Sequence, residues 1–238
     1  MNAMKKIGLI GGMSWESSKV YYEIVNETVK ERLGGFHSAR CVMDSVDFAA
    51  IEKLQHEDDW VSMDQTMAES AANLEKAGAD LIILCTNTMH LCSEAITAAV
   101  YIPFIHIAAA TGERIREQGI SKVLLLGTRF TMEKDFFKAL LQEDFGVEVV
   151  VPGEDDRTLV HRVIYEELVK GHIEASSKKA FQKIIRRAQD ELGVQGVILG
   201  CTEIPLLIQQ EDVDIITFDT TRIHAESAVD FALSISGN

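Results

Sequence analysis

The amino-acid sequence predicts an α/β protein built from two pseudo-symmetric parallel-sheet domains, related by internal duplication, with an active site in the cleft between them. Short apolar runs of strand length alternate with longer amphipathic stretches, which is typical of βαβ units. Motifs of the first half also recur in the second half at a constant distance. With 238 residues, 47% of them hydrophobic, the chain can bury a sizeable core.

Several of the predicted strands are continuous runs of Val, Ile and Leu, as expected for strands that helices cover on both faces. The stretches between them have the length and periodicity of amphipathic helices. We expect strands at residues 6–10, 40–46, 79–84, 104–107, 123–126, 147–151, 196–199 and 215–218. We expect helices at residues 17–32, 61–76, 131–143, 158–170 and 174–192.

Two pairs of motifs define the repeat. The Gly8–Gly11 segment matches Leu124–Gly127, and Asp80–Thr86 matches Gly196–Thr202. Both pairs are 116 residues apart (127 − 11 and 201 − 85). The repeat predicts a first α/β half at residues 1–110 and a second half at residues 111–238, with the last helix able to return from the C-terminus to the first half.

Charge and cysteine content exclude several classes of function. A net charge of −14 argues against nucleic acid and anionic membranes as partners. No apolar run has the length of a membrane span, and the N-terminus lacks a signal-peptide pattern. The four cysteines have no zinc-ligand spacing and are too few for a disulfide scaffold. We therefore expect a cytoplasmic enzyme with reduced thiols, without a metal.

The repeated motifs each place a cysteine at the carboxyl end of a predicted strand, where parallel sheets bind ligands. Cys85 and Cys201 each precede a predicted helix, whose N–H groups and dipole favour the thiolate. Thr86–Thr88 and Thr202 add donors beside them. If the two thiols face each other, one can remove a proton from a carbon while the other returns one, which inverts a stereocentre without a cofactor.

The turn at Gly11–Ser14 is a second candidate for binding, because its backbone N–H groups can hold a carboxylate. It lacks the spacing of a dinucleotide fingerprint or a phosphate loop, but Gly127-Thr128 is its counterpart in the repeat. His90, five residues after Cys85, is expected either to fix the following helix or to contribute to the site.

At these residues the sequence resembles the aspartate/glutamate racemase family. The resemblance covers essentially the whole chain and rests on Ile7–Ser14, Leu84–His90, Val123–Thr128 and Gly200–Pro205. The Gly11–Ser17 stretch is similar to the broad-specificity amino-acid racemase branch. The resemblance implies a racemase independent of pyridoxal phosphate, with no cofactor, two pseudo-symmetric α/β domains, a small amino-acid substrate and a homodimer.

Carried over to this chain, the resemblance implies that Cys85 and Cys201 are the catalytic acid/base pair, with Glu203 placed to meet the substrate ammonium group. The positions expected to contact the substrate are Met13, Ser14, Gln55, Thr86, Asn87, Thr88, Thr128, Thr202, Glu203 and Lys170.

The chain also departs from two branches of the family. Glutamate racemases carry Asp-Ser-Gly at the first turn and a histidine after the second Cys-Thr, where this chain has Gly12-Met13-Ser14 and Glu203. Aspartate racemases hold the side-chain carboxylate with an arginine after the second strand, where this chain offers Gln55. Lys170 could supply a replacement cation. Aspartate, glutamate or a broader set of amino acids therefore remain open as substrates.

Three alternatives share the fold. A hydantoin racemase or a cis-trans isomerase is compatible with two thiols, whereas a decarboxylase needs one protonating thiol. Glu203 suits a substrate with an ammonium group and therefore favours amino acids. A non-catalytic small-molecule sensor would leave the paired cysteine motifs without a use.

Overall fold

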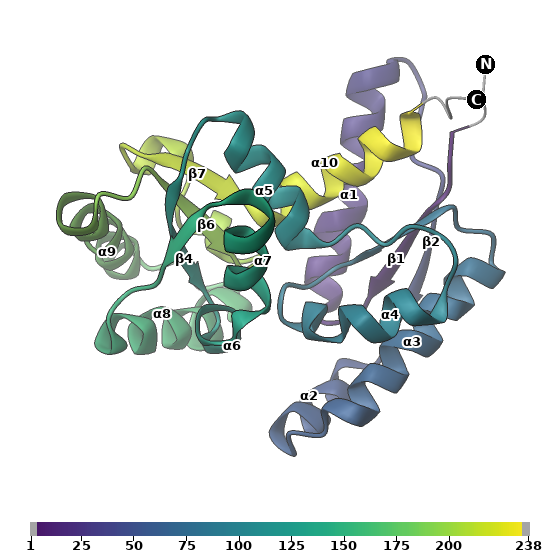
Figure 1. The fold of residues 1–238 in the computed structure, drawn as a ribbon, viewed down its shortest axis with the longest axis horizontal. Helices are drawn as coiled ribbons and strands as arrows, with labels where there is room; N and C mark the ends of the chain where they lie inside the picture. The colour runs from purple at the N-terminus through teal and green to yellow at the C-terminus, as the bar shows by residue number, and fades with distance from the viewer. Residues whose placement is uncertain (1–3, 235–238) are drawn as a thin grey trace. The chain divides into compact units, whose positions relative to one another are not determined.

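The computed structural model describes residues 4–234, and within them the chain divides into two compact units. Unit 1 comprises the chain up to Ile107 and from His224 onward, and unit 2 comprises Ala108–Ile223. The chain thus passes between the units twice, near the start of α5 (Ile107–Glu117) and within α10 (Thr220–Leu233). Each unit contains one parallel sheet, so the predicted α/β class with two parallel sheets is confirmed (Figure 1).

Unit 1 has a three-stranded sheet in the order β2-β1-β3. Its register pairs Ile10 with Leu84 and Gly11 with Ser45, so the carboxyl ends of the three strands lie at one edge. Besides α10 and the first residue of α5, its elements are β1 (Ile7–Gly11), α1 (Trp15–Leu33), β2 (Cys41–Ser45), α2 (Phe48–His56), α3 (Trp60–Lys76), β3 (Leu81–Leu84), the 3-10 helix η1 (Thr88–Cys92) and α4 (Ser93–Ala99).

The alternation of side chains along β1 and β3 builds two cores in unit 1. Ile7, Leu9, Leu81 and Ile83 point to one face and pack against α1 and α10. Neighbouring strand residues point to the other face and pack against α2, α3, η1 and α4. Helices therefore cover both faces of the sheet, as the continuous apolar strands predict.

Unit 2 has a four-stranded sheet in the order β5-β4-β6-β7, in which β5-β4-β6 repeats the order of β2-β1-β3. Gly127 pairs with Gly200, so β4 and β6 also end at one edge. Its elements after α5 are β4 (Lys122–Gly127), α6 (Arg129–Glu133), α7 (Asp135–Phe145), β5 (Glu148–Val150), α8 (Glu154–Glu166), η2 (Leu168–Lys170), α9 (Ala175–Leu192), β6 (Gly196–Gly200), η3 (Ile204–Leu206), η4 (Gln210–Asp212) and β7 (Ile216–Asp219).

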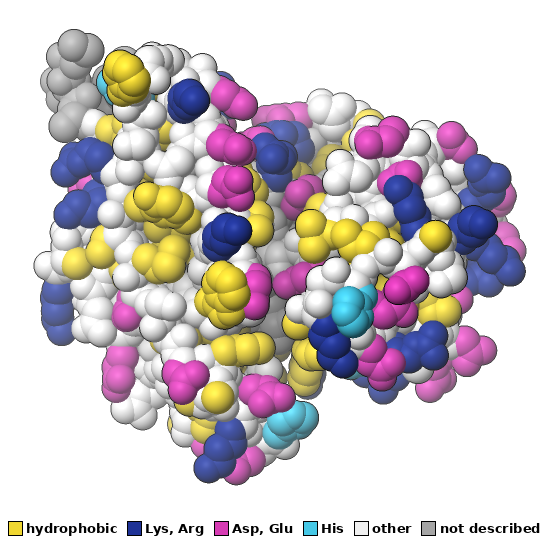
Figure 2. Space-filling view, turned by 180° about the vertical axis from the view of Figure 1, so that it is seen from behind, with side chains coloured by type: hydrophobic (Ala, Val, Ile, Leu, Met, Phe, Trp, Pro, Cys, Tyr) yellow, Lys and Arg dark blue, Asp and Glu magenta, His cyan; other side chains and the backbone are white. Residues whose placement is uncertain are grey.

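One face of the unit 2 sheet packs against α8 and α9 (Figure 1). Leu124, Leu126, Val197 and Leu199 point to this face and meet apolar side chains of both helices. Some basic residues of α9 pair with acids, for example Lys178 with Asp212 and Arg187 with Asp156. On the face that Figure 2 shows, Lys and Arg are interspersed with Asp and Glu.

Three predicted elements differ from the structure. The expected helix at residues 158–170 begins earlier and is divided, because α8 covers Glu154–Glu166 and η2 covers Leu168–Lys170. The expected strand at residues 104–107 is reduced to a single bridge between Phe104 and Ile82, and Ile107 already begins α5. Pro103 lacks an N–H and cannot extend a ladder on its side of this bridge. The expected helix at residues 131–143 is divided, because Lys134 has an extended backbone (ψ 155°) between α6 and α7.

Candidate active site

Cys85 follows β3 directly, and its backbone N–H continues the ladder by donating to the Ile10 carbonyl at 2.9 Å. Its side chain points to the same face as Leu81 and Ile83, into the core formed with α1 and α10. The residue is 0% exposed. Burial raises the pKa of the Cys85 thiol, because a thiolate there would lose its hydration.

The turn after Cys85 is held by local hydrogen bonds. The Thr86 N–H donates to the Leu84 carbonyl at 2.9 Å, and the His90 backbone N–H donates to the Asn87 carbonyl at 3.1 Å. The Thr86 carbonyl accepts from His90 Nδ1 at 2.8 Å. Thr86 and Thr88 are partly buried and Asn87 is buried, so these predicted contact residues stay next to Cys85.

Cys201 follows β6 in the same way and packs against the α8–α9 core, while remaining partly exposed. Its Sγ donates a hydrogen bond to Glu203 Oε2 at 2.9 Å. Burial, and then the charge of Glu203, raise the pKa of the Cys201 thiol well above its usual range. Hydrogen bonds from the backbone N–H groups of Thr202 and Glu203 oppose this rise in pKa without overcoming it.

The expected stabilisation of both thiolates by helix N-termini is therefore wrong for the resting protein. Cys85 precedes a 3-10 helix of 5 residues and Cys201 one of 3 residues, rather than long α-helices with an appreciable dipole. Desolvation dominates at both sites, so Cys85 and Cys201 carry protons at neutral pH.

The Gly11–Ser14 turn leaves β1 at the carboxyl edge of the unit 1 sheet. Gly12 has φ +95°, and a Cβ there would overlap the Val46 backbone, so only glycine fits. Its N–H donates to Ser18 Oγ at 2.8 Å, so this one N–H of the turn is already bonded within the protein. The Ser14 hydroxyl accepts from the Ser17 N–H at 3.3 Å and caps α1.

Two further predicted residues of unit 1 converge on the segment after Cys85. Gln55, on α2, donates from Nε2 to the sulfur of Met89 at 3.4 Å, and Met89 lies in η1. Met13 is buried in the same core as Met89. The structure thus places Gln55 against the segment that follows Cys85, and Met13 in the core that this segment joins.

In unit 2, Thr128 follows β4 beside the end of β6, because Gly127 and Gly200 are paired. Its hydroxyl accepts from the Thr131 N–H at 3.4 Å and caps the short helix α6. The structure therefore gives Thr128 a capping role, as it does Ser14, and each residue caps the helix after the first strand of its unit.

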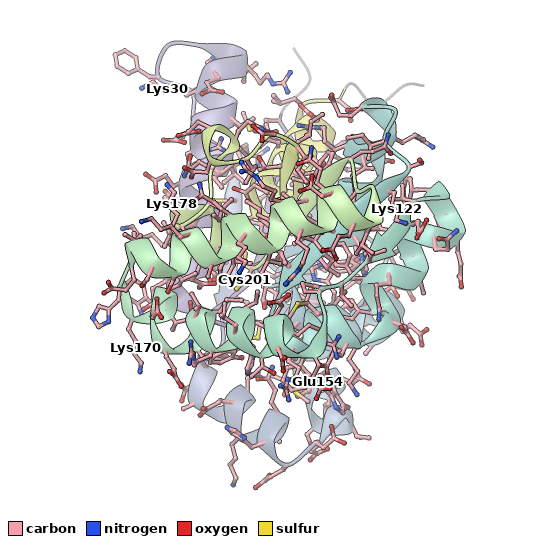
Figure 3. All side chains as sticks on the ribbon, turned by 90° about the vertical axis from the view of Figure 1, so that its left-hand side faces the viewer. Lys30, Lys122, Glu154, Lys170, Lys178 and Cys201 are labelled. Carbon is pink, nitrogen blue, oxygen red and sulfur yellow. The ribbon has the colours of Figure 1, made fainter. Side chains whose placement is uncertain are left out.

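Lys170 ends η2 and is exposed. Figure 3 shows it at the end of the α8–η2 segment, separated in that view from Cys201, which lies behind α8 and α9. Within the described residues its ammonium makes no ion pair. Lys170 is thus not held at the Cys201 turn by any contact of its own.

The sequence did not single out a cluster of buried aromatic polar groups on the Cys85 side of unit 1. His90 and His224 are 0% exposed, with ring centroids 5.5 Å apart, and His106 lies 4.6 Å from His90 by the same measure. Tyr21 hydrogen-bonds to His224 Nδ1 at 2.9 Å. Histidines within apolar stretches were the available signal. Among residues 4–234, no group of three His, Cys, Asp or Glu is arranged to hold a metal ion.

The chain is similar to known proteins over most of its length. The profile of the Asp/Glu/hydantoin racemase family matches residues 10–228. The broad-specificity amino-acid racemase RacX of Bacillus subtilis (strain 168) is 23% identical over 230 residues, covering 94% of this chain and 96% of RacX. No helix within residues 4–234 is long and apolar enough to cross a membrane.

Two solved structures are more similar in sequence. A Yersinia pestis protein assigned to the Asp/Glu racemases is 49% identical, with a TM-score of 0.93, covering 97% of this chain and 100% of its own. An aspartate racemase homologue from Pyrococcus horikoshii OT3 is 37% identical, with a TM-score of 0.88 and coverage of 97% and 100%. The chain therefore belongs to the Asp/Glu/hydantoin racemase family.

Proposed function

We propose that the protein is a cofactor-independent amino-acid racemase in which Cys85 and Cys201 act as the two acid/base groups. The observation that carries the proposal is their equivalence: each thiol directly follows the corresponding strand of its own sheet, at the carboxyl edge. Parallel α/β sheets bind their ligands at this edge. The proposal requires the two thiols to approach the α-carbon of one substrate from opposite sides.

The chemistry follows from the raised pKa of both thiols. A thiol with a raised pKa forms little thiolate, but the thiolate it forms is a stronger base toward a weakly acidic C–H bond. Glu203 supports the removal of the proton from Cys201, because its carboxylate already accepts a hydrogen bond from the thiol. Transfer of that proton to Glu203 leaves a Cys201 thiolate, which removes the α-proton.

Inversion is complete when Cys85, still protonated, delivers its proton to the opposite face of the planar carbanion and becomes a thiolate. The reverse direction uses Cys85 as base and Cys201 as acid, so the same two groups serve both enantiomers. Cys85 then takes up a proton from water and Glu203 returns its proton to water, which restores the starting protonation of all three groups.

The substrate class rests on the residues around the two turns. A second role for Glu203 is to meet the substrate ammonium with the oxygen that does not hold Cys201, which favours amino acids over hydantoins. Gln55, partly buried next to Met89, offers an amide rather than a cation to the substrate side chain. We therefore propose aspartate, glutamate or a broader set of amino acids, with Lys170 a candidate for binding a side-chain carboxylate.

From the resemblance to the aspartate/glutamate racemase family, we also propose that the protein is a homodimer in the cytoplasm. The molecular mass by light scattering is expected to be about twice the 26.4 kDa of one chain. A monomeric mass with full activity would remove the dimer from the proposal.

The function is tested by incubating the protein with a panel of L-amino acids in D2O, without added cofactor, and following loss of the α-proton signal by NMR. We expect exchange with at least one acidic or neutral amino acid, followed by appearance of the D enantiomer. Cys85→Ala and Cys201→Ala are expected to abolish racemisation. Cys41→Ala and Cys92→Ala, at thiols outside the repeated motifs, are matched controls that are expected to retain it.

An absence of exchange across the panel, with folded protein and reduced thiols, would contradict the proposal. Exchange with a hydantoin or loss of CO2 from a malonate would assign another reaction to the same two turns. Ligand binding without any chemistry would indicate a sensor.

A further inference from the structure

The buried His224 of unit 1 is joined to the core that contains Cys85, and the His90 ring lies against the His224 ring. Tyr21, which contacts His224, belongs to the core that also contains Cys85. His90 is fully buried and lies only five residues after Cys85 in the sequence. A buried polar ring in such a core must satisfy both of its nitrogens, which fixes its protonation.

The hydrogen bonds determine the tautomer of His90. Its Nδ1 lies 2.8 Å from the Thr86 carbonyl, an acceptor only, so Nδ1 must carry the proton and donate. Its Nε2 accepts a hydrogen bond from the Ile107 N–H at 3.1 Å, so Nε2 must be unprotonated. His90 is therefore neutral, in agreement with the lowering of its pKa by burial and by the neighbouring His106 and His224.

The same reasoning gives the opposite tautomer for His224. Its Nε2 lies 2.8 Å from the Ile105 carbonyl and must donate, whereas Nδ1 accepts from the Tyr21 hydroxyl at 2.9 Å. Burial lowers the pKa of His224 to about 3, so it too is neutral at physiological pH.

Together the two rings connect the Cys85 turn to one segment. His90 joins the Thr86 carbonyl, one residue after Cys85, to the N–H of Ile107. Ile107 is the first residue of α5, whose N–H has no acceptor within its own helix. His224 holds the carbonyl of Ile105 two residues earlier. The segment so anchored is the one through which the chain leaves unit 1.

We propose that His90 is a positioning residue for Cys85: through its two nitrogens it fixes the Cys85-Thr86 turn to the Ile105–Ile107 segment, which His224 and Tyr21 hold in place. The inference rests on the proposed function in so far as the positioned thiol is an acid/base group. The geometry of the catalytic turn would then depend on a side chain that does not touch the substrate.

Two substitutions at His90 separate its two hydrogen bonds. The Asn side-chain nitrogen lies close to the place of Nδ1, so His90→Asn keeps the donor to Thr86 and loses the acceptor for Ile107. The longer Gln side chain reaches the place of Nε2, so His90→Gln keeps an acceptor for Ile107 and loses the donor to Thr86. His56→Gln, at an exposed histidine of α2, is the matched control.

We expect His90→Gln to lower kcat about 100-fold with a smaller change in KM, since a displaced catalytic group can reduce the rate by this factor. His90→Asn is expected to retain kcat within about 10-fold of the wild type, because the Thr86 carbonyl keeps its donor. A readout independent of turnover is alkylation of each cysteine by iodoacetamide, followed by peptide mass spectrometry. Alkylation of Cys85 is expected to accelerate in His90→Gln, while alkylation of Cys201 stays unchanged.

Equal kcat and equal Cys85 alkylation in the Asn and Gln variants would overturn the proposal. The ring 15N NMR spectrum of the wild type at neutral pH gives a further test. A charged His90, or a proton on Nε2 of His90 and on Nδ1 of His224, would also overturn the proposal. If His90→Gln does not fold, Tyr21→Phe removes one hydrogen bond at the far end of the cluster, and faster alkylation of Cys85 alone is again expected. Unchanged alkylation of Cys85 in the folded Tyr21→Phe variant would overturn the proposal too. A wild type without racemase activity but with the expected alkylation pattern would refute the function and leave the positioning role standing.

Discussion

Replacing His224 with Gln is expected to reduce the loss in the free energy of unfolding of unit 1 that occurs as the pH falls. The ring is 0% exposed and neutral, and burial lowers its pKa from the ordinary 6.5 to about 3. As the pH falls below 6.5, the unfolded chain takes up a proton at this histidine while the folded chain does not. The free energy of unfolding therefore falls progressively between pH 6.5 and pH 3. From about pH 7.5 to about pH 5, the loss is about 2 kcal/mol for this one side chain.

The assay is urea unfolding at both pH values, monitored by tryptophan fluorescence. Both tryptophans, Trp15 and Trp60, belong to unit 1, so the signal reports the unit that contains His224. The free energy of unfolding of the variant is lower than that of the wild type at both pH values, because the variant loses buried hydrogen bonds. Its free energy of unfolding should, however, change less between the two pH values than that of the wild type, by about 2 kcal/mol. His56→Gln, at an exposed histidine, should leave the difference unchanged. The same acid-induced loss in His224→Gln and in the wild type would refute the neutral, buried assignment.

Two further predictions concern the carboxyl edges of the sheets. Glu203→Gln removes the charge that raises the pKa of the Cys201 thiol, so Cys201 should be alkylated at lower pH than in the wild type; an unshifted pH profile of alkylation would contradict the contact. Gly12→Ala should lower the free energy of unfolding by about 2 kcal/mol or more, because φ is positive and the added Cβ meets the Val46 backbone. Gly35→Ala, also at positive φ but in open space, should cost only about 1 kcal/mol, and equal losses by thermal unfolding would contradict the close approach.

Much of the architecture could be predicted because its signals are local. Continuous apolar runs such as Leu81–Leu84 and Val197–Leu199 indicate strands that are covered on both faces, and both are fully or nearly fully buried. The distance of 116 residues between the motifs predicted two similar α/β halves. The order β2-β1-β3 recurs as β5-β4-β6, as expected when a duplicated sequence repeats its topology. The expected strand at residues 104–107 was wrong, since its apolar pattern gave no weight to Pro103.

The site was less predictable, because its electrostatics depend on contacts between distant residues. The positions of Cys85 and Cys201 at strand ends followed from the motifs, but the pKa values of their thiols depend on burial. The types of residue that flank a cysteine in the sequence do not reveal how far its thiol is desolvated. Similarly, nothing local indicates that His90 meets His224, since 134 residues (224 − 90) separate them in sequence.

The most direct test of the two-thiol account uses single-cysteine variants in D2O with each enantiomer of the preferred substrate. Cys85→Ser and Cys201→Ser retain one acid/base thiol each, so both are expected to lose racemisation while still exchanging the α-proton of one enantiomer. The account predicts that the two variants exchange opposite enantiomers, and that Cys41→Ser behaves as the wild type. Racemisation surviving in either variant, or exchange of the same enantiomer by both, would contradict it.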